Sequence, residues 1–253
     1  MRVATWNLNN RVGNVAFRPE AANASIALNA DILVFNEYYP KQYAAAFTSA
    51  LADAGWTYQE TSKDSGEKAN RVLIASRLPL QPFEIYLPDF DRQFSANILG
   101  VSVPSSGLSI IGVRVPWYDK QDAGLVFDAW EWLESTAAGL KDQPAIILGD
   151  LNVGLKSNRS RGGEHFRRIL TSGWHRAIPK ETSSYYGASG RQSEIDHILG
   201  TAVCEFSNAR YVTELAGYQF AGTTSAISDH TALLTDGAFR LSVYVLSSDS
   251  LNS

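Results

Sequence analysis

Short apolar runs alternate with amphipathic stretches along this chain, and this alternation limits the folds that it can adopt. The runs are rich in Val, Ile and Leu and are bounded by turn-forming residues, which favours buried strands. We expect strands at residues 2–8, 31–36, 71–76, 96–103, 108–113, 145–148, 195–199 and 231–234. Strands that alternate with helices predict an α/β protein.

The amphipathic stretches predict four helices, at residues 19–30, 41–54, 123–138 and 163–172. Pro19 suits a first helical position, because the amide hydrogen that proline lacks would have no partner there. Gly55 follows the second helix and is a candidate for its C-terminal cap. No Pro-, Gly- or Ser-rich linker divides the chain. We therefore expect one domain over residues 1–240, with an edge segment or flexible tail at 241–253.

Charge and cysteine content narrow the function classes. The 253 residues carry a net charge of −4, so an anionic partner must be held by a local basic patch or a metal rather than by a broad basic face. Cys204 is the one cysteine, which excludes an internal disulfide and a Cys-rich metal site. No signal-peptide core and no membrane-spanning run of ~18 apolar residues is evident. We expect a cytoplasmic protein, and the oligomeric state stays open.

The segment GDLNVG places two polar residues, Asp150 and Asn152, directly after a predicted strand. Side chains two residues apart face the same side if the backbone stays extended past Gly149. A carboxylate and a carboxamide that project together can coordinate a hard cation, orient water or hold a phosphate oxygen. Asp, Asn and Gly are also common turn formers, so an ordinary turn is the alternative.

Similar polar groups occur at or near the ends of other apolar runs: Asn7 and Asn9, Asn36 and Glu37, Asp196, and Asp229 and His230. Each has a simpler interpretation, as a turn, a solvated strand end, a satisfied buried acid or a core histidine. Because α/β sheets bind ligands at strand ends, one convergent site explains all of them better than separate coincidences. Carboxylates, amides and an imidazole suit Mg²⁺ or Mn²⁺ and the metal-assisted attack of water on phosphorus.

These motifs, in this order and approximate spacing, resemble those of the endonuclease/exonuclease/phosphatase superfamily: WNLN, NE, VLIASRLPL, GDLNVG, EIDHIL and SDH. The resemblance spans about residues 1–235. It implies a DNase-I-like fold, a four-layered α/β sandwich in which two mixed sheets pack face to face with helices outside. It also implies a divalent-metal-dependent phosphodiesterase that uses in-line attack of an activated water.

The resemblance assigns a metal site and a catalytic set. Glu37 resembles the principal metal ligand, and Asn7, Asn9 and Asp229 would complete or neighbour that site. The catalytic residues that it implies are Asn7, Asp150, Asn152, Asp196 and His230, and we add Arg114 as a group that can stabilise charge on a phosphate oxygen.

Within this set, Asp150 would orient or deprotonate the attacking water, and Asn152 would hold the scissile phosphate. His230 would contact a phosphate oxygen or transfer a proton, with Asp196 fixing its tautomer. Which of Asp150 and His230 is the base stays open.

Arg114 departs from the family pattern, because members often carry Tyr or His there. Family members also often place Asn where this chain has Trp117. A guanidinium can bind a non-bridging phosphate oxygen, but it is a poor general acid because it does not deprotonate. The alternative for Arg114 is a salt-bridged strand residue.

Three stretches bear on the substrate. KSNRSRGGEHFRR carries the basic residues Lys156, Arg159, Arg161, Arg167 and Arg168, which either follow a nucleic-acid backbone or form a solvated loop and helix start. Trp117 and Tyr118 would offer a stacking surface, a lid or core packing, and the loop 183–192 would bring Tyr185 or Arg191 to the substrate. A nuclease acting on DNA or RNA is the first expectation. A phosphatase or phosphodiesterase on a small phosphorylated molecule or lipid headgroup is the second, and a catalytically silent binding module is the third.

Overall fold

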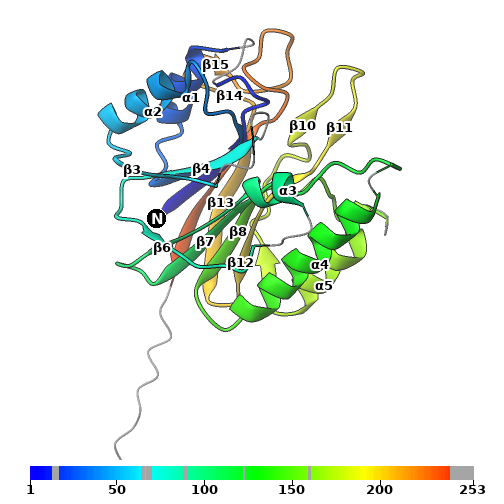
Figure 1. The fold of residues 1–253 in the computed structure, drawn as a ribbon. Helices are drawn as coiled ribbons and strands as arrows, with labels where there is room; N and C mark the ends of the chain where they lie inside the picture. The colour runs from blue at the N-terminus through cyan, green and yellow to red at the C-terminus, as the bar shows by residue number, and fades with distance from the viewer. Residues whose placement is uncertain are drawn as a thin grey trace, which may run out of the picture.

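The computed structural model describes residues 1–12, 17–63, 66, 70–87, 91–121, 123–158 and 161–239. Two six-stranded sheets pack face to face, and helices cover their outer surfaces (Figure 1). Both sheets are mixed, because β1 is parallel to β2 and β7 is parallel to β8 while the other neighbouring strands are antiparallel. The expected four-layered sandwich is therefore confirmed.

The first sheet has the strand order β13-β16-β1-β2-β4-β3. Its strands are β1 (Arg2–Asn7), β2 (Ile32–Tyr38), β3 (Tyr58–Thr61), β4 (Arg71–Ser76), β13 (Cys204–Val212) and β16 (Ala232–Phe239). Its outer face carries α1 (Glu20–Ala27) and α2 (Ala44–Asp53). Large apolar side chains fill this layer, among them Trp6, Phe35 and Trp56.

The second sheet has the order β5-β6-β7-β8-β12-β9. Its strands are β5 (Gln81–Pro82), β6 (Ile98–Val103), β7 (Leu108–Val113), β8 (Ala145–Asp150), β9 (Trp174–Arg176) and β12 (Asp196–Thr201). The helices are α3 (Arg92–Ala96), α4 (Ala123–Leu140) and α5 (Gly163–Thr171). Two small hairpins extend beyond the sheets: β10 (Tyr185–Tyr186) with β11 (Gln192–Ser193), and β14 (Glu214–Leu215) with β15 (Tyr218–Gln219).

A third apolar layer lies between the two sheets, where aliphatic side chains such as Val34, Ile74 and Ile146 meet. Gly112 of β7 permits this contact. A Cβ there would lie 2.7 Å from a methyl carbon of Val72 and 2.9 Å from one of Val34. The close approach of the sheets brings the end of β1 near the end of β8, which is where the polar motifs lie.

Several predicted boundaries need correction. The first helix begins at Glu20, with Pro19 as its N-cap rather than its first residue. The strand predicted at 96–103 is β6, which begins at Ile98 because Ala96 ends α3. The Gly55 cap is confirmed, because Gly55 has φ of 106° and its N–H donates a hydrogen bond to the Ala52 carbonyl. The predicted segment 241–253 lies outside the described residues. Within the described ranges, no helix has the length and apolar character needed to span a membrane.

Candidate active site

The loops after β1 and β8 make the same turn. The side-chain Oδ1 of Asn7 accepts a hydrogen bond from the Asn9 amide at 2.9 Å, and Oδ1 of Asp150 accepts one from the Asn152 amide at 3.0 Å. Asn9 and Asn152 have φ of 46° and 50°, a left-handed conformation that Asn tolerates better than most residues. The backbone past Gly149 is thus not extended, and the turn alternative is the one observed. A turn folds each pair of side chains together instead.

Glu37 owes its direction to an irregularity in β2. The register between β2 and β4 shifts between Phe35 and Tyr38, and Glu37 has φ of 51°. A β-bulge re-aims side chains in this way, and a positive φ at a non-glycine residue costs free energy that surrounding contacts must offset. Those contacts are hydrogen bonds to the carboxylate from Asn10 Nδ2 at 2.9 Å and Arg114 Nε at 2.9 Å.

Asp150 is buried at the end of β8 and is held by amides from two other strand ends. Asn7 Nδ2 donates to its Oδ2 at 3.0 Å, and its own backbone N–H donates to Asn36 Oδ1 at 2.9 Å. The preceding Gly149 has φ of 142°, and a Cβ on it would lie 2.0 Å from the Val113 carbonyl oxygen. Only glycine therefore lets the end of β8 pack this closely against the end of β7.

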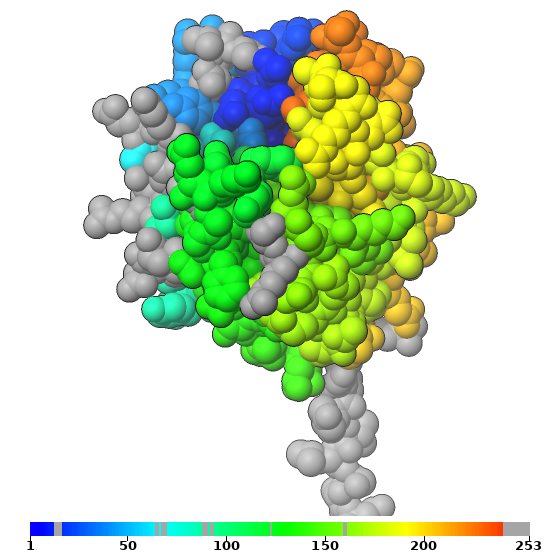
Figure 2. Space-filling view, turned by 90° about the vertical axis from the view of Figure 1, so that its right-hand side faces the viewer, coloured from blue at the N-terminus to red at the C-terminus, as the bar shows by residue number. Residues whose placement is uncertain are grey.

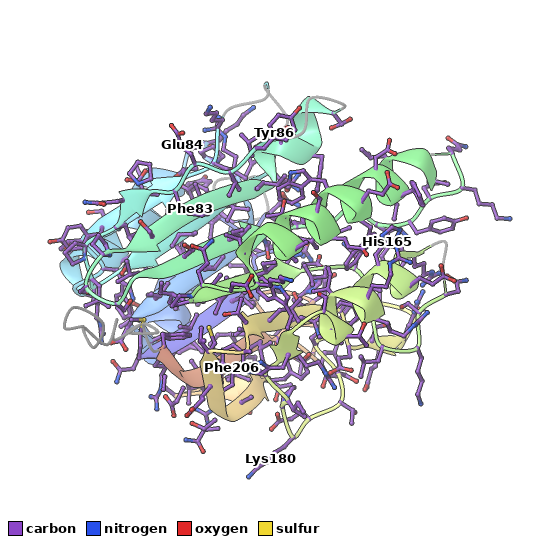
Figure 3. All side chains as sticks on the ribbon, turned by 90° about the horizontal axis from the view of Figure 1, so that it is seen from below. Phe83, Glu84, Tyr86, His165, Lys180 and Phe206 are labelled. Atoms are coloured by element: carbon purple, nitrogen blue, oxygen red, sulfur yellow. The ribbon has the colours of Figure 1, made fainter. Side chains whose placement is uncertain are left out.

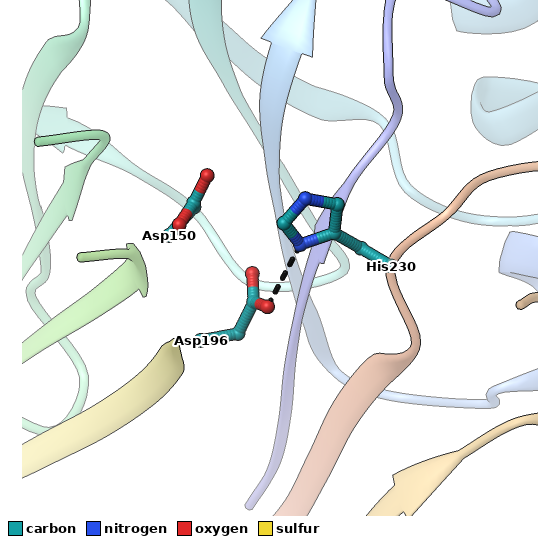
Figure 4. A group of neighbouring side chains, drawn as sticks. All are labelled: Asp150, Asp196 and His230. Carbon is teal, nitrogen blue, oxygen red and sulfur yellow. Dashed lines mark hydrogen bonds and ion pairs between the residues drawn. The ribbon is translucent and has the colours of Figure 1, made fainter. Parts of the chain in front are cut away.

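His230 and Asp196 form a buried pair beside Asp150 (Figure 4). Their Nδ1 and Oδ2 atoms are 2.8 Å apart. The Trp6 indole N–H donates to the His230 carbonyl at 2.9 Å, and Ser184 Oγ accepts the Asp196 amide at 3.0 Å, so both backbones are fixed. With Nδ1 directed at a carboxylate, Nε2 is the ring nitrogen left for a ligand or proton transfer.

Burial and neighbouring charges change two pKa values here. Burial raises the pKa of Asp150, and the Asp196 carboxylate raises it further, while His230 and Arg114 oppose the shift. Burial alone would lower the pKa of His230, but the carboxylates of Asp196, Asp150 and Asp229 outweigh it and raise that pKa to about 10. The site therefore holds a cationic imidazole near neutral pH together with a carboxylate of increased basicity.

These groups surround a cavity of about 210 Å³ at the ends of the strands. Most of its lining consists of residues predicted for the site: Asn9, Glu37, Arg114, Trp117, Asp150, Asn152, Asp229 and His230. Asn7 and Asp196 lie behind this lining and bond to Asp150 and His230. In Figure 2 the surface of the N-terminal segment (blue) adjoins the surfaces coloured yellow and orange, so chain segments far apart in sequence meet on this face.

The predicted substrate residues have different surroundings. Trp117 lines the cavity, and the guanidinium carbons of Arg161 and Arg191 lie 5.3 and 5.4 Å from its ring centroid. Tyr118 instead packs against the core under α4, which matches the core alternative for this residue. Arg159 lies outside the described residues.

The two arginines of α5 are engaged by the protein itself. Arg167 donates to the carbonyls of Leu155 and Ser157. Arg168 makes two hydrogen bonds to Glu134 of α4, which also contacts His165 of α5. His165 is labelled in Figure 3. The alternative interpretation, a solvated loop and helix start, therefore describes Arg167 and Arg168 better than a role in following a nucleic-acid backbone.

Sequence reasoning missed residues that support the site from behind. Asn10 bonds Glu37, and Ser228 Oγ donates to the Asn7 carbonyl at 2.8 Å and accepts the His230 amide at 3.1 Å. Tyr185, by contrast, was predicted to approach the substrate, and its ring centroid lies 5.0 Å from that of His230. Asn10 and Ser228 are next to predicted site residues in the sequence, and this adjacency is the one feature from which their role could have been predicted. The Ser184 contact joins a hairpin to β12 and has no local signature.

The oxygen donors that face the cavity fit a hard divalent cation. Glu37, Asp150 and Asp229 supply carboxylates, and Asn9 supplies an amide. The Arg114 guanidinium already lies between two of them, with Nε 2.9 Å from Glu37 Oε1 and 3.8 Å from Asp150 Oδ2. A second possible group consists of Asp150, Asp196 and His230, whose ligand atoms all lie within 4.8 Å of one another.

The two face-to-face sheets and the acid–amide–imidazole cavity at their strand ends define a DNase-I-like protein. Residues 4–230 match the Endonuclease/Exonuclease/phosphatase family, and the chain belongs to this family. No curated protein matches the sequence.

Solved structures show the same fold at low identity. An AP endonuclease from Archaeoglobus fulgidus is 18% identical with a TM-score of 0.70, covering 93% of this chain and 98% of that one. A variant of the 3′ phosphatase NExo from Neisseria, bound to a product DNA hairpin, is 20% identical with a TM-score of 0.71 and coverage of 94% and 100%. A mannosyl-6-phosphatase from Bacteroides thetaiotaomicron is 14% identical with a TM-score of 0.63 and coverage of 94% and 100%. These likenesses define the fold and leave the substrate open.

Proposed function

We propose that this protein is a divalent-metal-dependent phosphodiesterase, and that its substrate is DNA or RNA. The observation that carries the proposal is the meeting of Glu37, Asp150 and the Asp196-bonded His230 around one cavity. Each comes from a different strand end or loop, and together they supply a metal-binding carboxylate, a basic carboxylate and a cationic imidazole. Hydrolysis of a phosphodiester by water needs groups of these kinds.

Glu37 would hold Mg²⁺ or Mn²⁺, with Asn7, Asn9 and Asp229 completing or adjoining the site. When bound, the metal would supply positive charge to the phosphoryl oxygens. The Asp150–Asp196–His230 group is the weaker candidate, because its His230 Nδ1 and Asp196 Oδ2 atoms already bond each other.

Asp150 would orient the attacking water and accept its proton, since its raised pKa makes it a better base than an ordinary carboxylate. His230 would present its protonated Nε2 to a phosphate oxygen, with Asp196 holding the ring. Arg114 would place its remaining N–H groups on a non-bridging oxygen. Asn152 Nδ2 donates to the Val115 carbonyl at 2.8 Å, so it would exchange that bond to hold the phosphate.

The basic and aromatic groups around Trp117 support a nucleic-acid substrate. The fold likeness to the 3′ phosphatase NExo, which was solved with a product DNA hairpin, lends the same support. The net charge of −4 favours the second candidate, a phosphatase or phosphodiesterase for a small phosphorylated molecule or lipid headgroup. Endonuclease and exonuclease modes are both compatible with the site. The buried free thiol of Cys204 is compatible with a cytoplasmic location.

A substrate panel with Mg²⁺ tests the proposal. It should contain single- and double-stranded DNA, abasic DNA, RNA, inositol phosphates and bis(p-nitrophenyl) phosphate. We expect hydrolysis of a nucleic acid that stops on addition of EDTA. Hydrolysis of inositol phosphates alone would establish the second candidate. Hydrolysis of no phosphoester with either Mg²⁺ or Mn²⁺ would favour the silent binding module.

A further inference from the structure

Trp117 lies at the rim of the catalytic cavity with two guanidinium groups beside its ring. It is 42% exposed, and the guanidinium carbons of Arg161 and Arg191 lie 5.3 and 5.4 Å from its centroid. The two arginines come from separate parts of the chain, one from the loop before α5 and the other from the β10–β11 hairpin. Both cations therefore lie within cation–π distance of the same aromatic ring.

Stacking leaves the N–H donors of these arginines available. Neither side chain makes a hydrogen bond or ion pair to any residue that the structure describes, apart from the contact with Trp117. Neighbouring arginines differ in this respect, since Arg167 donates to two carbonyls and Arg176 pairs with Glu194. Arg161 and Arg191 therefore offer free N–H groups to an anion from outside the protein.

A second cavity, of about 710 Å³, continues from the catalytic cavity past this cluster. The two cavities share Trp117, Asn152 and Ile195. Lys156, Arg161 and Arg191 line the second one, and the single acid among its described lining residues is Glu194, which Arg176 neutralises. A chain with a net charge of −4 thus gathers cations along one groove that leads to the catalytic cavity.

Resting on the proposed function, we infer that the Trp117–Arg161–Arg191 cluster binds a second phosphate group of the substrate, next to the one that is cleaved. A substrate with phosphates at regular intervals and a backbone long enough to lie in both cavities is a nucleic-acid strand. Charge-assisted bonds from two guanidinium groups hold the second phosphate and so place the neighbouring phosphodiester in the catalytic cavity. The cluster therefore selects polynucleotides over compounds with a single phosphate.

Two short substrates that differ by one nucleotide test this inference. Dithymidylate (TpT) has one phosphate, and trithymidylate (TpTpT) has two. With Mg²⁺, the wild-type protein should have a kcat/KM for TpTpT about tenfold or more above that for TpT, beyond the twofold expected from the extra bond. Arg161→Ala and Arg191→Ala should each bring this ratio down toward two.

Three further variants separate charge from position. Arg77→Ala removes the same charge and the same kind of stacking contact, because Arg77 lies 4.0 Å from the centroid of Trp56, and it should keep the wild-type ratio. Trp117→Ala keeps both arginines but removes the surface that aligns them, so the ratio should fall, and Trp117→Phe should restore most of it. If the Arg161 and Arg191 variants keep the wild-type ratio, the inference is wrong even where the phosphodiesterase activity is real.

A binding measurement tests the cluster without catalysis. Fluorescein-labelled hexathymidylate, followed by anisotropy in EDTA, should bind the wild-type protein and Arg77→Ala about tenfold more tightly than Arg161→Ala or Arg191→Ala. Unlabelled TpTpT should compete better than inositol bisphosphate. Equal competition by the two compounds would assign the cluster to a small bisphosphate. Equal affinity of all the variants for labelled hexathymidylate would show that the cluster is not a phosphate site. Either result contradicts the inference, whereas a lack of hydrolysis alone contradicts only the proposed function.

Discussion

Asp150 and Asp196 lie directly opposite each other in the antiparallel register of β8 and β12. Both carboxyl groups are buried, so their repulsion is screened little by water. His230 offsets it on the side of Asp196, and Asn7 and Arg114 offset it on the side of Asp150. The arrangement concentrates negative charge at one point of the sheet, and this charge accounts for the raised pKa of the histidine.

Replacing Asp196 by Asn should change the titration of His230 directly. The pKa of His230 is raised to about 10, so its contribution to stability is fully present below the ordinary value of 6.5 and is lost as pH rises through about 10. In Asp196→Asn the pKa of His230 should fall toward 6.5. Titration of the imidazole resonances by NMR measures this, and an unchanged pKa would contradict the role of Asp196.

His197 should make the protein sensitive to acid. Burial lowers its pKa from 6.5 to about 4, and its Nε2 lies 2.7 Å from the Val153 carbonyl oxygen. The unfolded state takes up this proton first as pH falls, so stability present above 6.5 is lost toward pH 4. His197→Gln keeps a donor for Val153 and removes the titration. Between pH 7 and 5, urea unfolding should show a loss of free energy about 2 kcal/mol larger in the wild type than in the variant. Equal losses would contradict the assignment.

Arg114 should compete with a metal for Glu37. Its guanidinium pairs with Glu37 at 2.9 Å, so a cation must displace it or share the carboxylate with it. Arg114→Met should therefore bind Mn²⁺ more tightly in the absence of substrate, by about tenfold, as measured by calorimetry. It should also hydrolyse phosphodiesters more slowly, because the phosphate loses a bidentate partner. Weaker Mn²⁺ binding in the variant would show that Arg114 supports the metal site.

Gly149 should not tolerate a side chain. A Cβ there would lie 2.0 Å from the Val113 carbonyl oxygen, and the φ of 142° disfavours other residues. Gly149→Ala should lower the free energy of unfolding by about 2 kcal/mol or more. Gly139→Ala is the matched control, because a Cβ at this helical position meets no atom within 4 Å and alanine favours helices. Chemical denaturation compares the two, and similar stabilities would contradict the tight approach of β8 to β7.

The buried elements were predicted well because their periodicity is strong. The predicted ranges 71–76 and 108–113 coincide with β4 and β7. β13 was missed, since a register irregularity between Ser207 and Arg210 interrupts its alternation and much of its length is exposed. Strands of two residues, such as those of the β10–β11 hairpin, are too short to show any period.

The convergence of the site was predictable because polar residues end buried strands. The direction of Glu37 was not, since its positive φ accompanies a register shift between β2 and β4 that the sequence does not show. The same holds for Tyr118 and Trp117, neighbours in sequence of which one packs on the core and the other lines the cavity. Residue type alone could not separate them.

The central claim is tested most directly by measuring phosphodiester hydrolysis with Mg²⁺ in the wild type, Asp150→Ala and His230→Ala. Circular dichroism should first show that each protein is folded, and His175→Ala, a half-buried histidine on β9, serves as the control. We predict EDTA-sensitive activity in the wild type and the control, and turnover lower by about 10² or more in the two site variants. Full activity in both Asp150→Ala and His230→Ala would contradict the account.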